Sequence, residues 1–331
     1  MYKIAIIEPI HEDGVKLIEN QNDFSYELIT NTDENFLIDK LKDFDAIALR
    51  TAKLSAKIIN NCKKLKIVSR HGVGYDNVDL TTLSTNKILL TITINANAIT
   101  VSEHVISMMF YLNKKIHLFN ESVKENNFDK LRIANNNIIT INSELYEKNL
   151  LIAGFGRIGR ELAKRCKSFG MQVFVYDPYV NENTLLDCGV KQIKSLNQAL
   201  SIADYTSIHM PLNKETKNLI NKEHFKIMKK NSFIINTARG GIINEVDLND
   251  ALEKKLIAGA GLDVFENEPP PKNHPLFSLD NIVLSPHNAA LTLECRKRMA
   301  IESCETVIYF LNKNKKLNYN NIVNKEFVKQ L

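Results

Sequence analysis

Short apolar runs alternate with amphipathic stretches along most of the chain. In the first hundred residues, the strand-like runs are Lys3–Ile7, Tyr26–Ile29, Ala46–Leu49, Lys66–Ser69 and Ile88–Thr93. Helical patterns such as Phe36–Lys42 and Ala56–Cys62 lie between them. This alternation predicts an α/β fold in which a parallel sheet carries helices on both faces.

A longer helical pattern follows, from Thr100 to Val123. Thr100 or Ser102 is a candidate N-cap, and a Met-rich apolar face predicts packing against a core. The polar stretch Lys124–Asn137 then predicts a loop, and the Asn-rich segment 129–143 has no role that the sequence reveals.

Alternation resumes at Leu150 and continues to the last helical pattern. Further strand-like runs are Leu150–Ala153, Val173–Tyr176, Tyr205–His209, Phe233–Asn236, Ala258–Asp263 and Ile282–Ser285, and Thr292–Asn312 predicts the final helix. Ligands of open parallel sheets bind at the carboxyl ends of the strands. The polar residues after these strands are therefore expected to face one crevice.

The first turn of this second half has the sequence Gly154-Phe-Gly-Arg-Ile-Gly159, between a strand and a helix. Gly154 permits a tight turn, Gly156 allows the backbone to approach a pyrophosphate, and Gly159 allows close packing of helix on strand. Asp177 ends the next strand and is placed to bind a ribose diol. No basic residue follows it to accept a 2′-phosphate, so the segment predicts NAD(H) rather than NADP(H).

Composition narrows the function further. Lys plus Arg number 43 and Asp plus Glu number 38, a net charge of +5 that suits an anionic small molecule, and no basic block predicts nucleic-acid binding. The five cysteines are scattered, which favours a reducing cytoplasmic location and predicts no metal site. No apolar run approaches the length of a membrane span, and the first residues lack the features of a signal peptide.

A nicotinamide cofactor transfers a hydride but does not supply the proton that the substrate needs. Reduction of a ketone therefore requires an acid near the carbonyl oxygen, and histidine suits that role near neutral pH. His287 follows a strand and a proline, Glu268 lies in a proline-rich turn, and Arg239 begins a Gly-Gly turn. Each residue alone has a second interpretation: a structural histidine, a turn carboxylate and a surface ion-pair residue.

The motifs taken together resemble the D-isomer-specific 2-hydroxyacid dehydrogenase family. They are SRHGVGYDNVDL, NAITVSEH, GFGRIG, NTARGG, GLDVFENEP and SPHNAA, in this order. The resemblance implies a flavodoxin-like substrate domain over residues 1–99 plus 288–331. A Rossmann NAD-binding domain over 100–287 is inserted in it, with a crevice between the two that closes about a hinge.

By this resemblance, Arg239 binds the substrate carboxylate and carbonyl, His287 is the acid/base, and Glu268 is its partner. The implied cofactor-binding set is Val101, Gly154, Gly156, Arg157, Ile158, Gly159, Asp177, His209, Pro211, Thr237, Ala238 and Asp263, with Asp263 near the nicotinamide amide. Backbone N–H groups of Val73 and Gly74 hold the substrate carboxylate. We interpret His71 and His104 as packing or pocket-wall residues, and His209 as structural or beside the cofactor.

Arg50 and Arg70 follow consecutive strands, and arginines at similar positions contact the phosphate in phosphoglycerate dehydrogenases. The sequence therefore favours D-3-phosphoglycerate as the 2-hydroxy acid, with surface ion pairs as the other interpretation. A glyoxylate or hydroxypyruvate reductase is the second hypothesis. An NAD-sensing corepressor-like binding protein is a third, from a different class. We also expect a homodimer that lacks a C-terminal regulatory domain.

Overall fold

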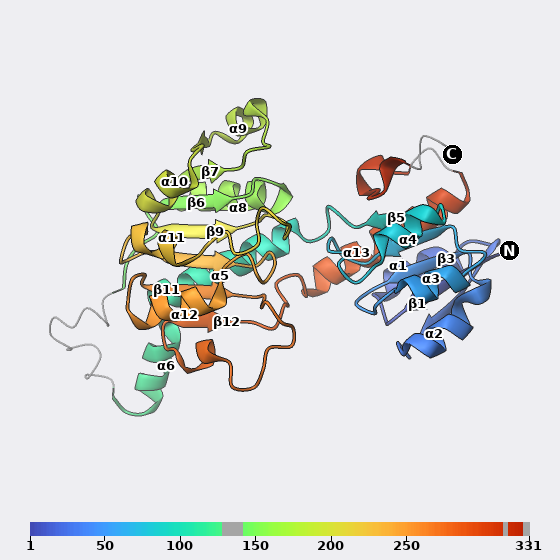
Figure 1. Ribbon diagram of the computed structural model, residues 1–331, viewed down its shortest axis with the longest axis horizontal. Coiled ribbons are helices and arrows are strands. Elements are labelled where there is room, and N and C mark those ends of the chain that lie inside the picture. Colours follow the sequence, from blue (N-terminus) through green and yellow to red (C-terminus); the bar gives the residue numbers. More distant parts are fainter. Residues whose placement is uncertain (128–141, 314–316, 327–331) are drawn as a thin grey trace. The chain divides into compact units, whose positions relative to one another are not determined.

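The computed structural model describes residues 1–127, 142–313 and 317–326. The chain divides into two compact units (Figure 1). Unit 1 comprises Met1–Asn97 with Ala290–Leu331, and unit 2 comprises Ala98–Ala289. The sequence placed these boundaries after Ile99 and His287. They differ because the long helix of unit 2 begins at Ala98, and because the backbone N–H of Ala289 is bonded to Asp263 in unit 2.

Unit 1 is built on a five-stranded sheet in the order β2-β1-β3-β4-β5, with every pair parallel. Its strands are β1 (Tyr2–Ile7), β2 (Phe24–Ile29), β3 (Ala46–Leu49), β4 (Ile67–Arg70) and β5 (Leu89–Ile92). This is the strand order of flavodoxin-like sheets, so the predicted fold of the first domain is confirmed. β3 and β4 are neighbours, with Leu49 opposite Arg70.

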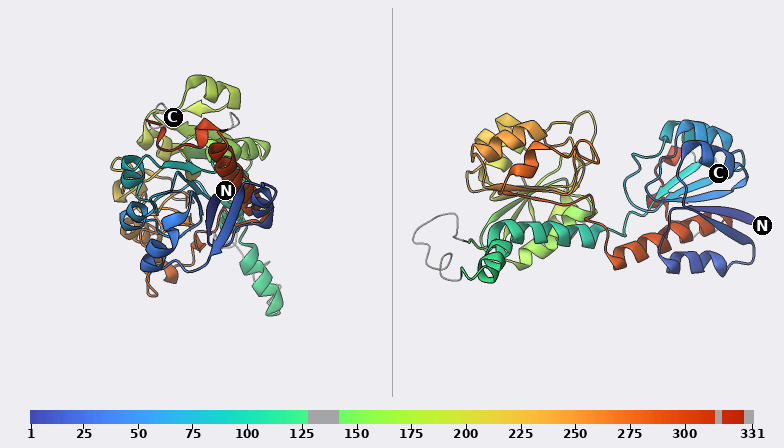
Figure 2. Two further views of the ribbon diagram at one scale, coloured as in Figure 1. Left: turned by 90° about the vertical axis from the view of Figure 1, so that its right-hand side faces the viewer. Right: turned by 90° about the horizontal axis from the view of Figure 1, so that it is seen from below.

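Helices cover both faces of this sheet. They are α1 (Glu12–Glu19), α2 (Glu34–Lys40), α3 (Ala56–Asn61), α4 (Leu80–Thr85) and α13 (Leu293–Leu311), with short 3-10 turns η1 (Leu41–Asp43) and η4 (Tyr319–Asn321). α1 and α13 pack together over one face, where Ile6 and Val307 share a core, and α2, α3 and α4 enclose the other (Figure 2). The C-terminal segment returns along β5, where Asn324 bonds the backbone of Ile88 and Leu90.

Unit 2 contains a seven-stranded parallel sheet in the order β12-β11-β10-β9-β6-β7-β8. The strands are β6 (Asn149–Ala153), β7 (Gln172–Tyr176), β8 (Lys191–Gln192), β9 (Tyr205–Ile208), β10 (Phe233–Asn236), β11 (Gly259–Leu262) and β12 (Ile282–Leu284). The order reverses beside β6, as in doubly wound dinucleotide-binding sheets, which confirms the predicted Rossmann fold. The reversal places the β6 and β9 carboxyl ends side by side.

Two helical layers enclose the sheet of unit 2. Its helices are α5 (Ala98–Lys114), α6 (Ile116–Lys124), α8 (Arg157–Ser168), α9 (Glu182–Cys188), α10 (Leu196–Ile202), α11 (Lys222–Ile227) and α12 (Glu245–Glu253), with the 3-10 turn η3 (Pro275–Ser278). α5 and α8 share one core with Ile152 and Ile235, and α10, α11 and α12 share the other with Leu151 and Ile234 (Figure 2).

The predicted Thr100–Val123 helix is wrong in two respects. It begins at Ala98, so Thr100 and Ser102 are buried inside it instead of capping it, and the Ser102 hydroxyl donates to the Ile99 carbonyl. It also breaks at Lys115, whose φ of 49° is left-handed, and α6 starts afresh. The loop predicted for Lys124–Asn137 lies mostly outside the described residues. None of the described helices has the length and apolar content that crossing a membrane requires.

Candidate active site

The Gly-rich turn joins β6 to α8 at the reversal of strand order in unit 2. Gly154 has a φ of 96°, and a Cβ there would lie 2.7 Å from the His209 carbonyl. A Cβ on Gly159 would lie 2.6 Å from the Gly154 oxygen, so helix and strand touch backbone to backbone. By contrast, a Cβ on Gly156 would meet nothing within 4 Å. Gly156 thus leaves clear space in front of the first N–H groups of α8, where a pyrophosphate is favoured.

Asp177 follows β7 and closes this turn from the other side. One carboxylate oxygen accepts from the Phe155 N–H at 2.8 Å, and the other accepts from the Tyr179 N–H at 2.9 Å. A carboxylate has about four acceptor positions, so two remain for the hydroxyls of a ribose. The side chain is half-buried and held in one orientation before any nucleotide binds.

Two polar atoms near the ends of β9 and β10 are buried without a hydrogen-bond partner among the described residues: Thr237 Oγ1 and His209 Nδ1. The other ring nitrogen of His209 is bonded to Ser207 Oγ at 2.8 Å. Burial lowers the pKa of His209 to about 3, so the ring is neutral at physiological pH. Unpaired buried polar atoms are costly, and a bound group that supplies partners for them would recover part of that cost.

The rest of the predicted nucleotide-binding set is also in unit 2. Arg157 is exposed at the first turn of α8 and Ile158 follows it half-buried, whereas Val101 is buried in α5. Pro211 is exposed after β9, and its carbonyl accepts from the Thr216 hydroxyl. Within the described part of the chain, no group of three or more His, Cys, Asp or Glu side chains is arranged to hold a metal ion.

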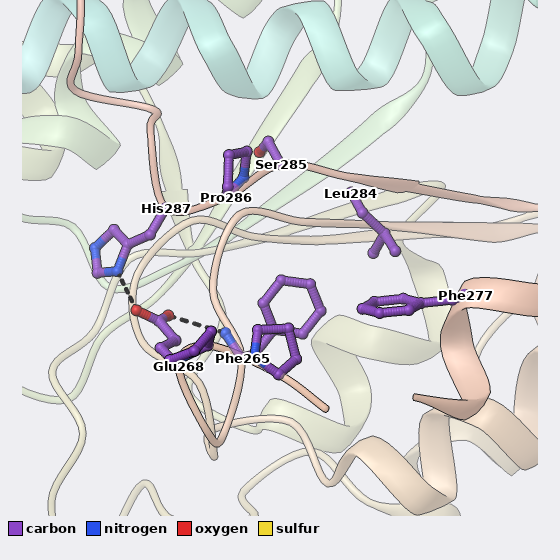
Figure 3. Close-up of a pocket in the computed structure, with 9 residues that line it drawn as sticks. Phe265, Glu268, Phe277, Leu284, Ser285, Pro286 and His287 are labelled. Atoms are coloured by element: carbon purple, nitrogen blue, oxygen red, sulfur yellow. Dashed lines mark hydrogen bonds and ion pairs between the residues drawn. The ribbon is translucent and has the colours of Figure 1, made fainter. Parts of the chain in front are cut away.

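His287 and Glu268 form a direct pair at the end of β12 (Figure 3). His287 Nδ1 lies 2.7 Å from one Glu268 oxygen, and the second oxygen accepts from the Phe265 N–H at 3.0 Å. An ionised carboxylate only accepts hydrogen bonds, so this contact places a proton on Nδ1 and leaves Nε2 for another group. The sequence proposed this partnership, and the structure brings the two residues together.

Asp263 is the buried anchor of the segment that carries His287. Only 1% of Asp263 is exposed. Its carboxylate accepts from the Ser285 hydroxyl at 2.5 Å and from the N–H groups of Asn288 and Ala289 at 2.9 Å each. His287 itself has a left-handed φ of 51°, which costs a residue with a side chain roughly 1 kcal/mol or more. The bonds from the neighbouring backbone groups hold the chain in that conformation.

Arg239 begins the turn after β10, half-buried, and its guanidinium donates to the Ala238 carbonyl at 2.7 Å. The Asn236 side chain holds this turn, because it accepts from the Ala238 N–H and donates to the Arg239 carbonyl. A Cβ on Gly240 would lie 1.9 Å from the Phe265 carbonyl oxygen. The turn that carries Arg239 therefore rests directly on the loop that carries Glu268.

A pocket of about 460 Å³ adjoins the His287–Glu268 pair within unit 2. Apart from these two side chains and Ser285, its lining is apolar: Phe265, Pro269, Pro270, Phe277, Leu284 and Pro286 (Figure 3). The carboxylate and imidazole thus have an apolar wall on one side.

The predicted substrate-binding residues of unit 1 lie at the carboxyl ends of β3 and β4, where Arg50 follows β3 and Arg70 is the last residue of β4. Arg50 donates to the Pro9 carbonyl at 3.1 Å, and Arg70 donates to the His71 carbonyl at 2.6 Å. Both guanidinium groups are half-buried, as are Val73 and Gly74 in the following loop. Glu8 holds the first loop through the N–H groups of Thr51 and Ala52. Partial burial raises the pKa of Glu8, but the hydrogen bonds from the Thr51 hydroxyl and from these two N–H groups, with the nearby Arg50, outweigh burial and lower this pKa.

Comparison with known proteins identifies this arrangement. Residues 106–289 match the model of the NAD-binding domain of D-isomer specific 2-hydroxyacid dehydrogenases. The chain belongs to this family. Unit 2 is accordingly its NAD-binding domain, and NAD is the cofactor that the clear space at Gly156 and the held Asp177 fit.

Three relatives illustrate the range of similar proteins. D-3-phosphoglycerate dehydrogenase of Methanocaldococcus jannaschii is 36% identical over 298 residues, which are 90% of this chain and 55% of that protein. Glyoxylate reductase of Korarchaeum cryptofilum is 33% identical over 93% of this chain and 92% of its own. The structure of D-lactate dehydrogenase from Aquifex aeolicus, complexed with NAD and lactic acid, has a TM-score of 0.83. It is 28% identical and covers 97% of this chain and 99% of its own. The chain spans about half the length of the phosphoglycerate dehydrogenases that it matches.

Several contacts between residues of the site were not predicted from the sequence. Ser285 Oγ connects Asp263 to His104 Nε2, which lies 3.0 Å away, although the sequence analysis gave His104 only a packing or wall role. The role of Asp263 beside the nicotinamide stays a prediction; its carboxylate binds the backbone beside His287 and lies 3.8 Å from His104 Nε2. These partners come from distant parts of the chain, and no local pattern reports such a contact. His71 is 5% exposed, as a packing residue would be.

Proposed function

We propose that this protein is an NAD-dependent dehydrogenase that transfers hydride between a D-2-hydroxy acid and its 2-oxo acid. The observation that carries the proposal is the His287–Glu268 pair, held at 2.7 Å on the same sheet edge as the Gly-rich turn. A binding protein needs the turn and Asp177, but it has no need of an imidazole paired with a carboxylate.

The proposed mechanism assigns one task to each residue. Bound NADH supplies the hydride. His287 donates a proton from Nε2 to the carbonyl oxygen in reduction and takes it back in oxidation. Glu268 fixes the ring orientation through Nδ1 and favours the charged imidazolium. The Arg239 guanidinium binds the substrate carboxylate, because its planar fork matches two oxygens.

We propose D-3-phosphoglycerate as the substrate, and this part of the proposal rests on unit 1. Arg50 directly follows β3 and Arg70 is the last residue of β4, and both lie at the same edge of the sheet because these neighbouring strands are parallel. Val73 and Gly74 lie half-buried after β4 and would offer their N–H groups to the substrate carboxylate. The D-3-phosphoglycerate dehydrogenase of Bacillus subtilis, for example, is 38% identical to this chain over 316 residues.

Glyoxylate or hydroxypyruvate reduction is the second candidate. A glyoxylate reductase aligns over nearly its whole length, 92%, whereas the phosphoglycerate dehydrogenases align over about half of theirs. These small substrates need only Arg239 and the Val73–Gly74 loop, so they make no use of Arg50 and Arg70.

The test is NADH oxidation across a panel of 2-oxo acids, with both cofactors and both product enantiomers analysed. We expect turnover to a D-product with NADH and a preference for 3-phosphohydroxypyruvate. His287→Ala should lower kcat by about 10²–10⁴-fold while NADH still binds. NADH binding without turnover on any 2-oxo acid would instead indicate an NAD-sensing protein.

A double variant tests whether Arg50 and Arg70 bind the phosphate of the substrate. Arg50→Ala combined with Arg70→Ala should lower kcat/KM for the phosphorylated substrate and leave glyoxylate reduction nearly unchanged. If kcat/KM for both substrates stays at the wild-type value, the phosphate-binding role of these arginines is wrong.

A further inference from the structure

Unit 2 contains a second histidine–glutamate pair, Glu245 and His274, in addition to the His287–Glu268 pair. Glu245 is the first residue of α12, and His274 is the residue before η3. His274 Nε2 lies 3.0 Å from Glu245 Oε2, and each side chain is only 12% exposed. Because an ionised carboxylate can only accept, this contact requires the proton of His274 to be on Nε2. Its Nδ1 is buried and has no hydrogen-bond partner among the described residues.

The other oxygen of Glu245 accepts from the Glu266 N–H at 2.6 Å. The preceding N–H, that of Phe265, donates to Glu268 at 3.0 Å. Two consecutive backbone N–H groups are therefore bound by two different carboxylates, one of which is the partner of His287. A shift of this short backbone stretch would move Glu268 and loosen its contact with the imidazole.

The same backbone is confined on its other sides. Gly240 packs so closely that a Cβ would lie 2.0 Å from the Phe265 carbonyl carbon and 2.5 Å from the Glu266 nitrogen. The Phe265 ring is packed edge-on against both His274 and Phe277, with ring centroids 5.9 and 6.2 Å apart. His274 thus contacts the loop directly through the Phe265 ring, and its Nε2 binds the carboxylate that holds the Glu266 N–H.

We propose that Glu245, oriented by His274, is a positioning residue that fixes the Phe265–Glu268 loop and hence the His287–Glu268 pair. This inference rests on the proposed function, because it assigns proton transfer to His287. The carboxylate is needed because it accepts from two donors at once. A glutamine at position 245 would offer one acceptor and would point N–H groups at a buried N–H donor.

Hydrogen exchange tests the positioning without any need for turnover. In Glu245→Gln, the peptide containing residues 263–271 should exchange its amide hydrogens about 10-fold faster, because its backbone anchor is lost. The peptide containing Gly154–Asp177 should exchange as in the wild type. Asp250→Asn is the matched control, because Asp250 lies on the same helix in an exposed pair with Lys254 and should change neither peptide.

Steady-state kinetics test the consequence. Glu245→Gln should lower kcat for 2-oxo acid reduction by about 10-fold, since misplacing a catalytic group by a fraction of an ångström is costly. The alkaline limb of the pH–rate profile should move to lower pH by about half a unit or more, because the carboxylate that favours the charged imidazole is less well held. The dissociation constant for NADH should stay within about twofold, because the Gly-rich turn is untouched.

If Glu245→Gln does not fold, His274→Gln is a second variant that tests the same positioning role. It keeps the Glu245–Glu266 bond and should shift exchange and the pH profile in the same direction by a smaller amount. Unchanged exchange in residues 263–271, or a loss of kcat with an unmoved pH–rate profile, would overturn the positioning role. A wild-type protein that turns over no 2-oxo acid would refute the proposed function instead, and the exchange result would still decide whether Glu245 anchors the loop.

Discussion

His71 should make the stability of the protein depend on pH between about 7.5 and 5. The ring is 5% exposed, and its Nε2 has no hydrogen-bond partner among the described residues. Burial, with the positive charges of Arg50 and Arg70, lowers the pKa of His71 from 6.5 to about 4, although backbone groups of His71 and Arg296 oppose the shift. Between these two values the unfolded chain binds a proton that the folded chain does not.

The sign and size follow from linkage. Since the unfolded state binds more protons, the free energy of unfolding rises with pH, so this stabilisation is complete above pH 6.5 and lost as pH falls. A pKa difference of this size corresponds to about 3 kcal/mol in total, of which about 2 kcal/mol is lost between pH 7.5 and 5.

Urea unfolding followed by circular dichroism at the two pH values measures this loss. His71→Gln and His71→Leu are both unable to titrate, so each should show a pH dependence smaller than that of the wild type by about 2 kcal/mol. The free energies of unfolding of the two variants at pH 7.5 should differ, because one replacement is polar and the other apolar. A change in pH dependence that both variants share therefore reports protonation, and the difference between them reports packing. If both variants lose as much free energy as the wild type, His71 is not held neutral by burial.

Three further outcomes test other parts of the structure. Asp263→Asn should lower the free energy of unfolding by about 2–4 kcal/mol in urea titrations, because an amide points donors at buried donors, whereas the exposed Asp280→Asn should change it by less than about 0.5 kcal/mol. Gly159→Ala should lower both the Tm and the NADH affinity, because its Cβ would meet a backbone oxygen at 2.6 Å, whereas Gly156→Ala should weaken NADH binding at an unchanged Tm. Asp177→Asn should reduce the preference for NADH over NADPH by about 10-fold in kcat/KM, since a 2′-phosphate no longer meets a negative charge.

The strands were predictable because buried parallel strands are short apolar runs. Phe233–Asn236 matches β10 in full, and Ala46–Leu49 matches β3. β8 was missed because Lys191–Gln192 is two polar residues at the sheet edge, paired only with β7. The break at Lys115 was missed because neither glycine nor proline marks it.

The site was predictable only in part. The resemblance of the motifs to the family pointed to Arg239, Glu268 and His287, because each of the three lies inside a short motif that can be read directly from the sequence. The anchoring of their loops was not predicted, since Asp263 was assigned only to the cofactor and Glu245 looks like an ordinary acid at a helix start. Glu245 and His274 are 29 positions apart, and their 3.0 Å contact exists only once the chain has folded.

The exposure of the residues explains why such anchors are needed. The His287 and Glu268 side chains are 50% and 36% exposed, so their ion pair alone contributes little to holding its own geometry. Asp263 has 1% of its surface exposed and binds the backbone beside His287. The Glu245 side chain is 12% exposed and accepts from the N–H of Glu266, two residues before Glu268. Charge-assisted bonds from backbone N–H groups are strongest where water is excluded, so the buried carboxylates fix the loops while the His287–Glu268 pair itself stays exposed.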